Sequence, residues 1–134
     1  MRNVLVDSCV ILDIMTEDPK WFEWSSEMIE EQASRSTLLI NPIIYAEVSV
    51  GFKKIEELEA VISQTFFKRT PLPWEAAFLA GKVFFQYRRS GGQRALPLPD
   101  FFIGAHAVIE NFYLLTRDTK RFQHYYPTLQ ILSP

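Results

Sequence analysis

The sequence has little cysteine, little net charge and no long hydrophobic run, and each absence excludes a class of protein. One cysteine among 134 residues, Cys9, excludes an internal disulfide framework and is typical of a reducing compartment. The longest apolar stretch, residues 101–115, contains His106, Glu110 and Asn111, so no segment predicts a membrane span. The N-terminus lacks the pattern of a secretory signal, and we therefore expect a soluble protein of the cytoplasm.

The composition is otherwise that of an ordinary globular domain. Hydrophobic residues make up 48% of the chain and charged residues 22%, with five glycines and eight prolines. These proportions exclude a disordered, collagen-like or low-complexity chain, and we predict a single domain over residues 1–134. The formal net charge of −2 argues against nucleic-acid binding by bulk positive charge, although it allows a local basic surface.

Short apolar runs alternate with longer amphipathic segments along the chain. Strands or extended segments are predicted at residues 2–6, 37–40, 66–71, 112–116 and 130–132. Helices are predicted from residue 8 to a stop at residues 17–19, and over residues 20–33, 42–52, 54–64, 74–89 and 100–110. Strands separated by long helices favour parallel pairing with right-handed crossovers. We therefore predict an α/β fold, a three-layer α/β/α sandwich with a central, mainly parallel sheet.

Local signals mark several ends of these elements. Ser8 is a suitable N-cap for the first helix, and Asn41 followed by Pro42 predicts the start of another. The Ser-Gly-Gly sequence at residues 90–92 predicts a break with enough backbone freedom for a mobile loop.

Four acidic residues fall where a parallel sheet would bring chain segments together at one edge. Asp7 and Asp118 follow predicted strands, Glu47 lies among apolar residues in a predicted helix, and Asp100 opens another helix. Three of them also have a structural explanation, because Asp7 can cap a helix, Asp100 suits a first turn and Asp118 can start a turn. Carboxylates in one cluster repel each other, so their convergence would require a cation, and oxygen ligands suit Mg²⁺ or Mn²⁺.

Four segments carry a resemblance to a known family. VLVDSCVILDI, INPIIYAEV, LPDFFIGAHA and LLTRDTKRF occur in this order along nearly the whole chain. Together they resemble the motifs of PIN-domain ribonucleases, and within that family the VapC-type toxins of toxin–antitoxin pairs. The resemblance implies that Asp7, Glu47, Asp100 and Asp118 are catalytic residues that hold Mg²⁺ or Mn²⁺. Some family members carry an acid or Asn shortly after the last Asp, where this chain has Lys120 and Arg121, so we expect four acidic ligands.

The resemblance also implies an activity and partners. The activity is endoribonucleolytic: in-line attack of water on an RNA phosphodiester leaves a 3′-hydroxyl and a 5′-phosphate. The expected partners are the RNA substrate, a cognate antitoxin and a second copy of the chain in a homodimer. In the family, the antitoxin can place a basic side chain in the acidic site.

Polar and basic neighbours of the acids have two interpretations each. Ser8 and Thr116 can orient a carboxylate or a metal-bound water through their hydroxyls, or can serve as a helix cap and a strand residue. Six basic residues can contact RNA phosphates or simply form a solvated surface: Arg88, Arg89, Arg94, Arg117, Lys120 and Arg121.

Other conspicuous residues are not assigned to chemistry. His106 lies six positions after Asp100 and so faces away from it on a helix, which predicts that it is packed or at an interface. His124 lies in a polar stretch without a zinc-site pattern, and Cys9 is expected in the core. The chain has more aromatic residues than its core comfortably hides, which predicts that some lie in interfaces.

Two other phosphate-handling classes fit less well. A receiver domain expects adjacent acids after the first strand, where Ser8 follows Asp7, and a haloacid-dehalogenase-like phosphatase expects an acid at the position of Cys9. The stronger alternative is a catalytically inactive PIN-fold scaffold that binds RNA or protein.

Overall fold

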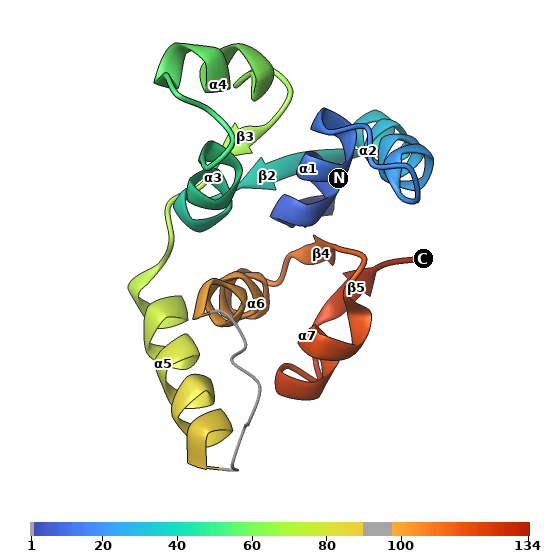
Figure 1. Ribbon diagram of the computed structural model, residues 1–134. Coiled ribbons are helices and arrows are strands. Elements are labelled where there is room, and N and C mark those ends of the chain that lie inside the picture. The colour runs from blue at the N-terminus through green and yellow to red at the C-terminus, as the bar shows by residue number, and fades with distance from the viewer. Residues whose placement is uncertain (1, 90–97) are drawn as a thin grey trace.

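The computed structural model of the chain describes residues 2–89 and 98–134, which form seven helices and five strands (Figure 1). The strands are β1 (Arg2–Val6), β2 (Ser36–Ile40), β3 (Lys68–Arg69), β4 (Tyr113–Leu115) and β5 (Gln130–Leu132). The helices are α1 (Ser8–Met15), α2 (Phe22–Arg35), α3 (Pro42–Ser49), α4 (Ile55–Val61), α5 (Trp74–Arg89), α6 (Leu98–Glu110) and α7 (Thr119–Tyr125).

The five strands form one sheet in the order β3-β2-β1-β4-β5, and every neighbouring pair is parallel. Consecutive side chains of the central strand, Val4, Leu5 and Val6, are all fully buried. Because successive side chains of a strand point to opposite faces, this burial requires a layer of helices on each face. The predicted α/β/α sandwich with a mainly parallel sheet is confirmed.

The parallel arrangement decides where a site can form. All carboxyl ends of the strands lie at the same edge of the sheet, and β1 pairs with β2 on one side and with β4 on the other. Residues that follow β1 and β4 are therefore neighbours in space although they are more than 100 positions apart in sequence. In Figure 1, α1–α4 lie on one side of the view and α5–α7 on the other.

The start of α3 follows the predicted capping logic. Asn41 Oδ1 accepts a hydrogen bond from Ile44 N at 2.9 Å, and Pro42 occupies the first turn, where it has no backbone donor to leave unpaired. The N-cap of α1 differs from the prediction. Asp7, rather than Ser8, precedes the helix in extended conformation, and its Oδ1 accepts from Ser8 N at 2.8 Å.

Several element ends differ from the sequence prediction. The α2 helix begins at Phe22 instead of residue 20, because Asp18 Oδ1 accepts from Lys20 N and Trp21 N and holds a turn before it. Helices α3 and α4 are shorter than predicted, and the extended segment at residues 66–71 contributes only the two residues of β3 to the sheet. The loop predicted at residues 90–92 lies outside the described residues.

The α7 helix was not predicted, because residues 119–125 form fewer than two turns and contain mostly polar side chains. Its Phe122 is buried, and the following Tyr126 is buried too and donates its hydroxyl proton to Phe101 O at 2.6 Å. These two aromatic side chains attach α7 to α6. Tertiary packing therefore specifies this helix more strongly than local propensity does.

The α6 helix places a buried polar residue, His106, beside Asn41 at the end of β2. His106 is fully buried, and its Nδ1 lies 2.9 Å from Asn41 Nδ2, so the prediction that it is packed is confirmed. Burial lowers the pKa of His106 to about 4, which keeps the imidazole neutral.

No helix among the described residues is long and apolar enough to cross a membrane.

The contact of α6 with α7 generates a stability prediction. A β-carbon at Gly104 would overlap the Tyr126 ring, whereas one at Gly81, on the exposed side of α5, would meet nothing within 4 Å. We expect Gly104→Ala to lower the free energy of unfolding by about 1–3 kcal/mol through overpacking. The matched control Gly81→Ala should raise it by up to about 1 kcal/mol through helix propensity. Urea denaturation measures both, and an unchanged Gly104→Ala variant would contradict the described packing.

Candidate active site

Asp7 lies at the carboxyl end of β1 and is almost completely buried, with 4% of its surface exposed. Besides Ser8 N, it accepts the hydroxyl proton of Thr116 at Oδ2 over 2.8 Å, and Cys9 Sγ lies 3.5 Å from the same oxygen. Thr116 Oγ1 also accepts from Asp118 N at 3.1 Å. The buried carboxylate is thus held by donors from both β1–α1 and the segment after β4.

Glu47 reaches the same edge of the sheet from the middle of α3. Its Oε1 accepts the hydroxyl proton of Ser8 at 2.8 Å. Ser8 therefore connects two of the predicted acids, since its backbone nitrogen donates to Asp7 and its side chain donates to Glu47. The partner that the apolar surroundings of Glu47 required is this serine.

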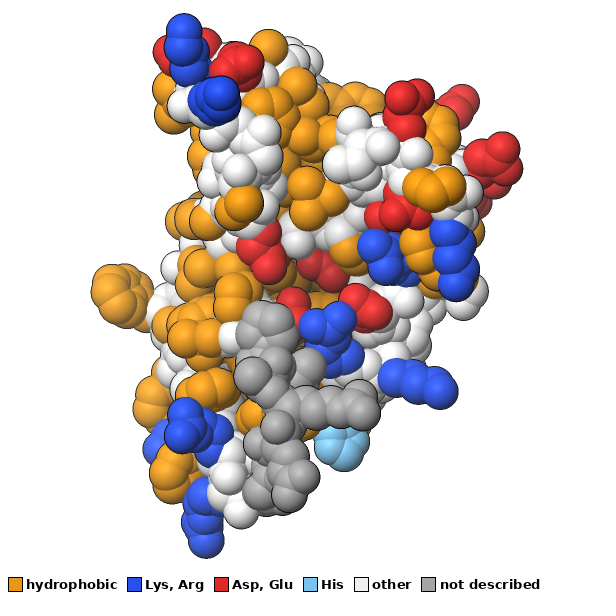
Figure 2. Space-filling view, viewed as in Figure 1, with side chains coloured by type: hydrophobic (Ala, Val, Ile, Leu, Met, Phe, Trp, Pro, Cys, Tyr) orange, Lys and Arg blue, Asp and Glu red, His pale blue; other side chains and the backbone are white. Residues whose placement is uncertain are grey.

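Asp100 and Asp118 complete the acidic group, and a guanidinium joins them. Asp100 lies in the first turn of α6, and Asp118 directly precedes α7. Arg121 Nη1 donates to Asp100 Oδ2 at 2.5 Å, and its Nη2 donates to Asp118 Oδ2 at 2.6 Å. In Figure 2, acidic side chains gather near the middle of the face shown, beside basic atoms.

The electrostatics indicate that the four acids act on one another. Burial raises the pKa of Asp7 and of Glu47, and hydrogen bonds from Thr116 and Ser8 oppose this only in part. Burial also raises the pKa of Asp100 to about 6, against the attraction of Arg121, and repulsion by Asp7 and Glu47 adds to the increase. Asp118 repels Asp7. The structure therefore brings together all four acids that the sequence singled out.

The donor chemistry of this group fits a hard divalent cation, since four mutually repelling carboxylates are stabilised by Mg²⁺ or Mn²⁺. The side chains of the described residues, however, do not place three acidic, cysteine or histidine groups in an arrangement that could coordinate an ion. Two of the four carboxylates, Asp100 and Asp118, instead pair with the guanidinium of Arg121. The ligands that the family resemblance predicts for such an ion are Asp7, Glu47, Asp100 and Asp118.

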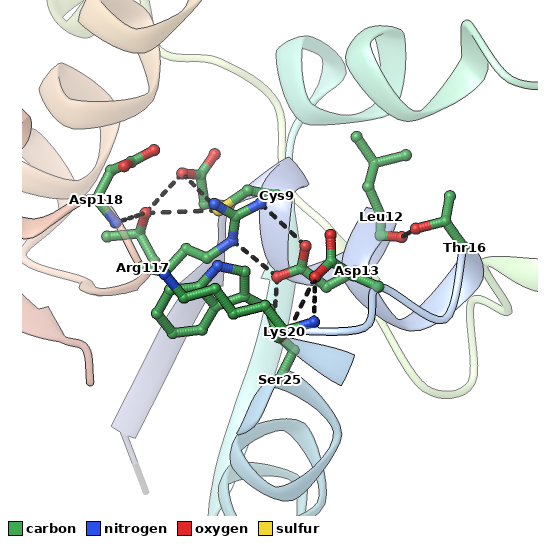
Figure 3. Close-up of polar contacts among 12 residues, drawn as sticks. Cys9, Leu12, Asp13, Thr16, Lys20, Ser25, Arg117 and Asp118 are labelled. Carbon is green, nitrogen blue, oxygen red and sulfur yellow. Dashed lines mark hydrogen bonds and ion pairs between the residues drawn. The ribbon is translucent and has the colours of Figure 1, made fainter. Parts of the chain in front are cut away.

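A second polar cluster supports the site, and the sequence analysis missed it (Figure 3). Asp13 of α1 is 3% exposed and accepts from Arg117 Nε at 2.9 Å, from Arg117 Nη2 at 3.0 Å and from Ser25 Oγ at 2.9 Å. The Arg117 guanidinium also lies over the ring of Trp21, 5.4 Å from its centroid. Arg117 lies between Thr116 and Asp118 in the sequence. Its ion pair with Asp13 therefore fixes the segment after β4 to α1. The sequence signal for this cluster was an acidic residue, Asp13, in the same apolar helix as Ile11 and Ile14.

The basic residues predicted as possible RNA contacts lie in three kinds of surroundings. Arg117 and Arg121 pair with carboxylates, as described. Arg88 and Arg89 are exposed at the end of α5, each 5.8 Å from the ring centroid of Phe84 or Phe85, and Lys120 is exposed on α7. Arg94 lies outside the described residues.

Cys9 belongs to the rim of the site as well as to the core. Its side chain packs against core residues, as predicted, but it also contacts Asp7 and lies 3.7 Å from Thr116 Oγ1. Burial raises the pKa of the Cys9 thiol to about 12, and the negative charge of Asp7 contributes to this rise.

This combination of a parallel α/β sandwich and a carboxylate group at one sheet edge agrees with a comparison against known families. The model of the PIN domain family matches residues 4–126, and the chain belongs to that family. No curated protein matches the chain.

Solved structures with a similar fold cover nearly the whole chain. One is a chain of VapBC2 from Rickettsia felis bound to a DNA fragment from their promoter, with TM-score 0.76, 20% identity and 98% of each chain covered. VapBC-1 from nontypeable Haemophilus influenzae gives TM-score 0.74 at 23% identity over 98% of this chain and 97% of that one. A toxin-antitoxin complex from Klebsiella pneumoniae gives 0.69 at 23% identity, with the same coverage. At these identities the likeness shows the fold.

The raised pKa of Asp100 predicts an unusual dependence of stability on pH. Between the ordinary pKa of 3.8 and the folded value of about 6, the folded chain holds a proton that the unfolded chain releases. The free energy of unfolding in EDTA therefore falls as pH rises through this window, by up to about 3 kcal/mol from this residue. We expect Asp100→Asn to remove that loss, so that its stability relative to the wild type increases with pH.

Asp18 supplies a control of opposite sign. Hydrogen bonds from Trp21 N and Lys20 N lower its pKa, so it stabilises the fold increasingly as pH rises through the acidic range. Asp18→Asn should therefore lose stability relative to the wild type with increasing pH. Thermal unfolding in EDTA at a series of acidic to neutral pH values measures both variants. Parallel curves for Asp100→Asn and the wild type would show that Asp100 titrates normally.

Proposed function

We propose that this chain is a metal-dependent endoribonuclease, a VapC-type toxin that a cognate antitoxin neutralises. The observation that carries the proposal is the convergence of Asp7, Glu47, Asp100 and Asp118 from four separate segments at the carboxyl edge of a PIN-family sheet. A partly buried group of mutually repelling acids is costly for stability, and such a cost is characteristic of functional sites.

The proposed catalytic roles follow from how each side chain is held. When bound, Mg²⁺ or Mn²⁺ would make water a better nucleophile and neutralise the charge that develops on the phosphate. Thr116 and the Ser8 backbone fix the two oxygens of Asp7, and the Ser8 hydroxyl orients Glu47. These donors restrict the rotation of the two carboxylates, as the partners of ligand side chains do in metal sites. RNA cleavage would leave a 3′-hydroxyl and a 5′-phosphate.

Relatives and surface features support the proposed partners. One fold relative is described as a toxin-antitoxin complex. On α5, the side chains of Trp74, Phe78 and Phe85 are 88%, 68% and 60% exposed and lie on one stripe of the helix. An exposed aromatic stripe of this kind is typical of an interaction surface. We propose that it forms the homodimer contact and that the antitoxin is a further partner.

The homodimer is tested by replacing one residue of this stripe. Phe78→Asp should shift the chain from dimer to monomer, because it places a charge in the apolar contact. Val50→Asp is the control, since Val50 is also an exposed apolar residue, at 85% against 68% for Phe78, but lies outside α5. Sedimentation velocity measures the mass of both. A monomeric wild type, or a dimer unaffected by Phe78→Asp, would contradict the proposed contact.

The alternative function is a catalytically inactive PIN-fold scaffold that binds RNA or protein. The ion pairs of Arg121 with Asp100 and Asp118 favour it, because they leave two predicted ligands paired with a protein cation. The presence of all four acids favours the enzyme.

Sequencing of new RNA 5′ ends distinguishes these functions and identifies the substrate. Purified protein is incubated with total cellular RNA in Mg²⁺, Mn²⁺ or EDTA. We expect discrete cuts that are lost in EDTA and reduced about 100-fold or more in Asp100→Asn, since loss of a metal ligand removes several kcal/mol of transition-state stabilisation.

Glu110→Gln serves as the matched control. It removes one negative charge from an exposed position at the other end of α6, and it should cut like the wild type. If the wild type and Asp100→Asn gave the same 5′-end maps with either metal ion, the scaffold function would be favoured.

A further inference from the structure

Arg121 occupies the position of a counter-ion in the acidic group. It donates from two different nitrogens to two carboxylates that belong to different segments, Asp100 at the start of α6 and Asp118 before α7. A planar guanidinium with several fixed N–H donors can bridge two acids in this way, whereas an ammonium acts as a single point. The side chain is 31% exposed, so the two ion pairs are partly shielded from water.

The charge of Arg121 also acts on the two acids that it does not contact. Its attraction opposes the rise in pKa of Glu47, and the negative charge of Asp7 contributes to the raised pKa of Arg121 itself. Burial disfavours the charged guanidinium, but Asp100 and Asp118 outweigh that cost. One side chain of this chain therefore compensates, in part, the same four charges that a metal ion would neutralise.

The backbone that carries Arg121 is firmly attached, whereas its side chain has a route to solvent. On one side, Phe122 is buried and Tyr126 donates to Phe101 O. On the other, the Arg117–Asp13 pair fixes the segment that leads into α7. Arg121 can therefore leave the carboxylates by rotation of its own long, partly exposed side chain, without displacement of α7.

We propose that Arg121 is a built-in counter-ion that competes with the divalent metal for Asp100 and Asp118. In the metal-free protein its guanidinium closes the acidic site, and metal binding requires it to move away from both carboxylates. This inference rests on the proposed function, because it assumes that these acids bind metal. If Arg121 competes in this way, the metal affinity of the site depends on a residue of α7 as well as on the ligands.

The competition has a measurable consequence. If the guanidinium occupies the carboxylates about nine-tenths of the time, the apparent affinity for metal is about tenfold weaker than that of the open site. Arg121→Gln should therefore bind Mn²⁺ about tenfold more tightly than the wild type. Calorimetric titration of the full chain with MnCl₂ measures this affinity without any assay of RNA cleavage.

Two further variants separate competition from a general effect of charge. Lys120→Gln makes the same change in net charge at the adjacent exposed position, and its affinity for Mn²⁺ should stay close to that of the wild type. Arg121→Lys keeps the charge but cannot bridge two carboxylates from separate nitrogens, so its affinity should lie between those of the wild type and Arg121→Gln. Arg121→Lys also carries the test if Arg121→Gln fails to fold, which circular dichroism would reveal.

Nuclear magnetic resonance reports directly on the motion of the Arg121 side chain. In ¹⁵N spectra of arginine side chains, the Arg121 signal should show restricted rotation in EDTA and should change to a mobile signal when Mg²⁺ is added. Arg117 pairs with Asp13, which is not one of the four acids of the site, so its signal should stay restricted under both conditions.

The outcomes distinguish this inference from the proposed function. Equal affinities of Arg121→Gln and Lys120→Gln for Mn²⁺ would overturn the competition while leaving a metal-dependent enzyme in place. Absence of Mn²⁺ binding by every variant would overturn both. An Arg121 signal that stays restricted when Mg²⁺ is bound would also overturn the competition, because it would place guanidinium and metal in the site together.

Discussion

Repulsion among the four carboxylates at the carboxyl edge of the sheet is the constraint to which the other polar contacts respond. Two carboxylates about 4 Å apart repel by roughly 4 kcal/mol at an effective dielectric constant of 20. The structure offsets this repulsion with hydrogen-bond donors. Thr116, Ser8 and Arg121 each donate hydrogen bonds to one or two of the acids. The hydrophobic core fixes where the chain segments end, and these donors allow the acids to remain there.

The parts of the fold that could be predicted are those where local chemistry and tertiary packing agree. β1, α5 and β5 have the expected bounds, because a buried β-branched strand, a long amphipathic helix and a short apolar tail have few alternative structures. The cap of α3 at Asn41 was predictable for the same reason, since Asn before Pro satisfies the first turn without help from elsewhere. In contrast, α7 depends on the contacts of Phe122 and Tyr126 with α6, which no short window of sequence contains.

The acids of the site were predictable from strand ends and from resemblance, but their cations were not. Arg117 and Arg121 look alike in the sequence, as two members of a basic run. In the fold Arg117, which precedes α7, pairs with Asp13 on α1, whereas Arg121, within α7, bridges Asp100 and Asp118. A charge run in sequence carries no information on partners when those partners lie up to 104 residues away. Long-range ion pairs are therefore the least accessible feature of such a site.

The contact of Cys9 with Asp7 affects how this site withstands oxidants. Peroxide and disulfides react with the thiolate form of cysteine, and the thiol fraction that ionises falls tenfold for each unit by which the pKa exceeds the pH. With a pKa of about 12, Cys9 is a thiolate in only about one molecule in 10⁵ at neutral pH. Burial of the thiol, together with the negative charge of Asp7, thus suppresses sulfenic acid formation at this position. A lone cysteine at the rim of the site is in this setting a chemically inert space-filling group.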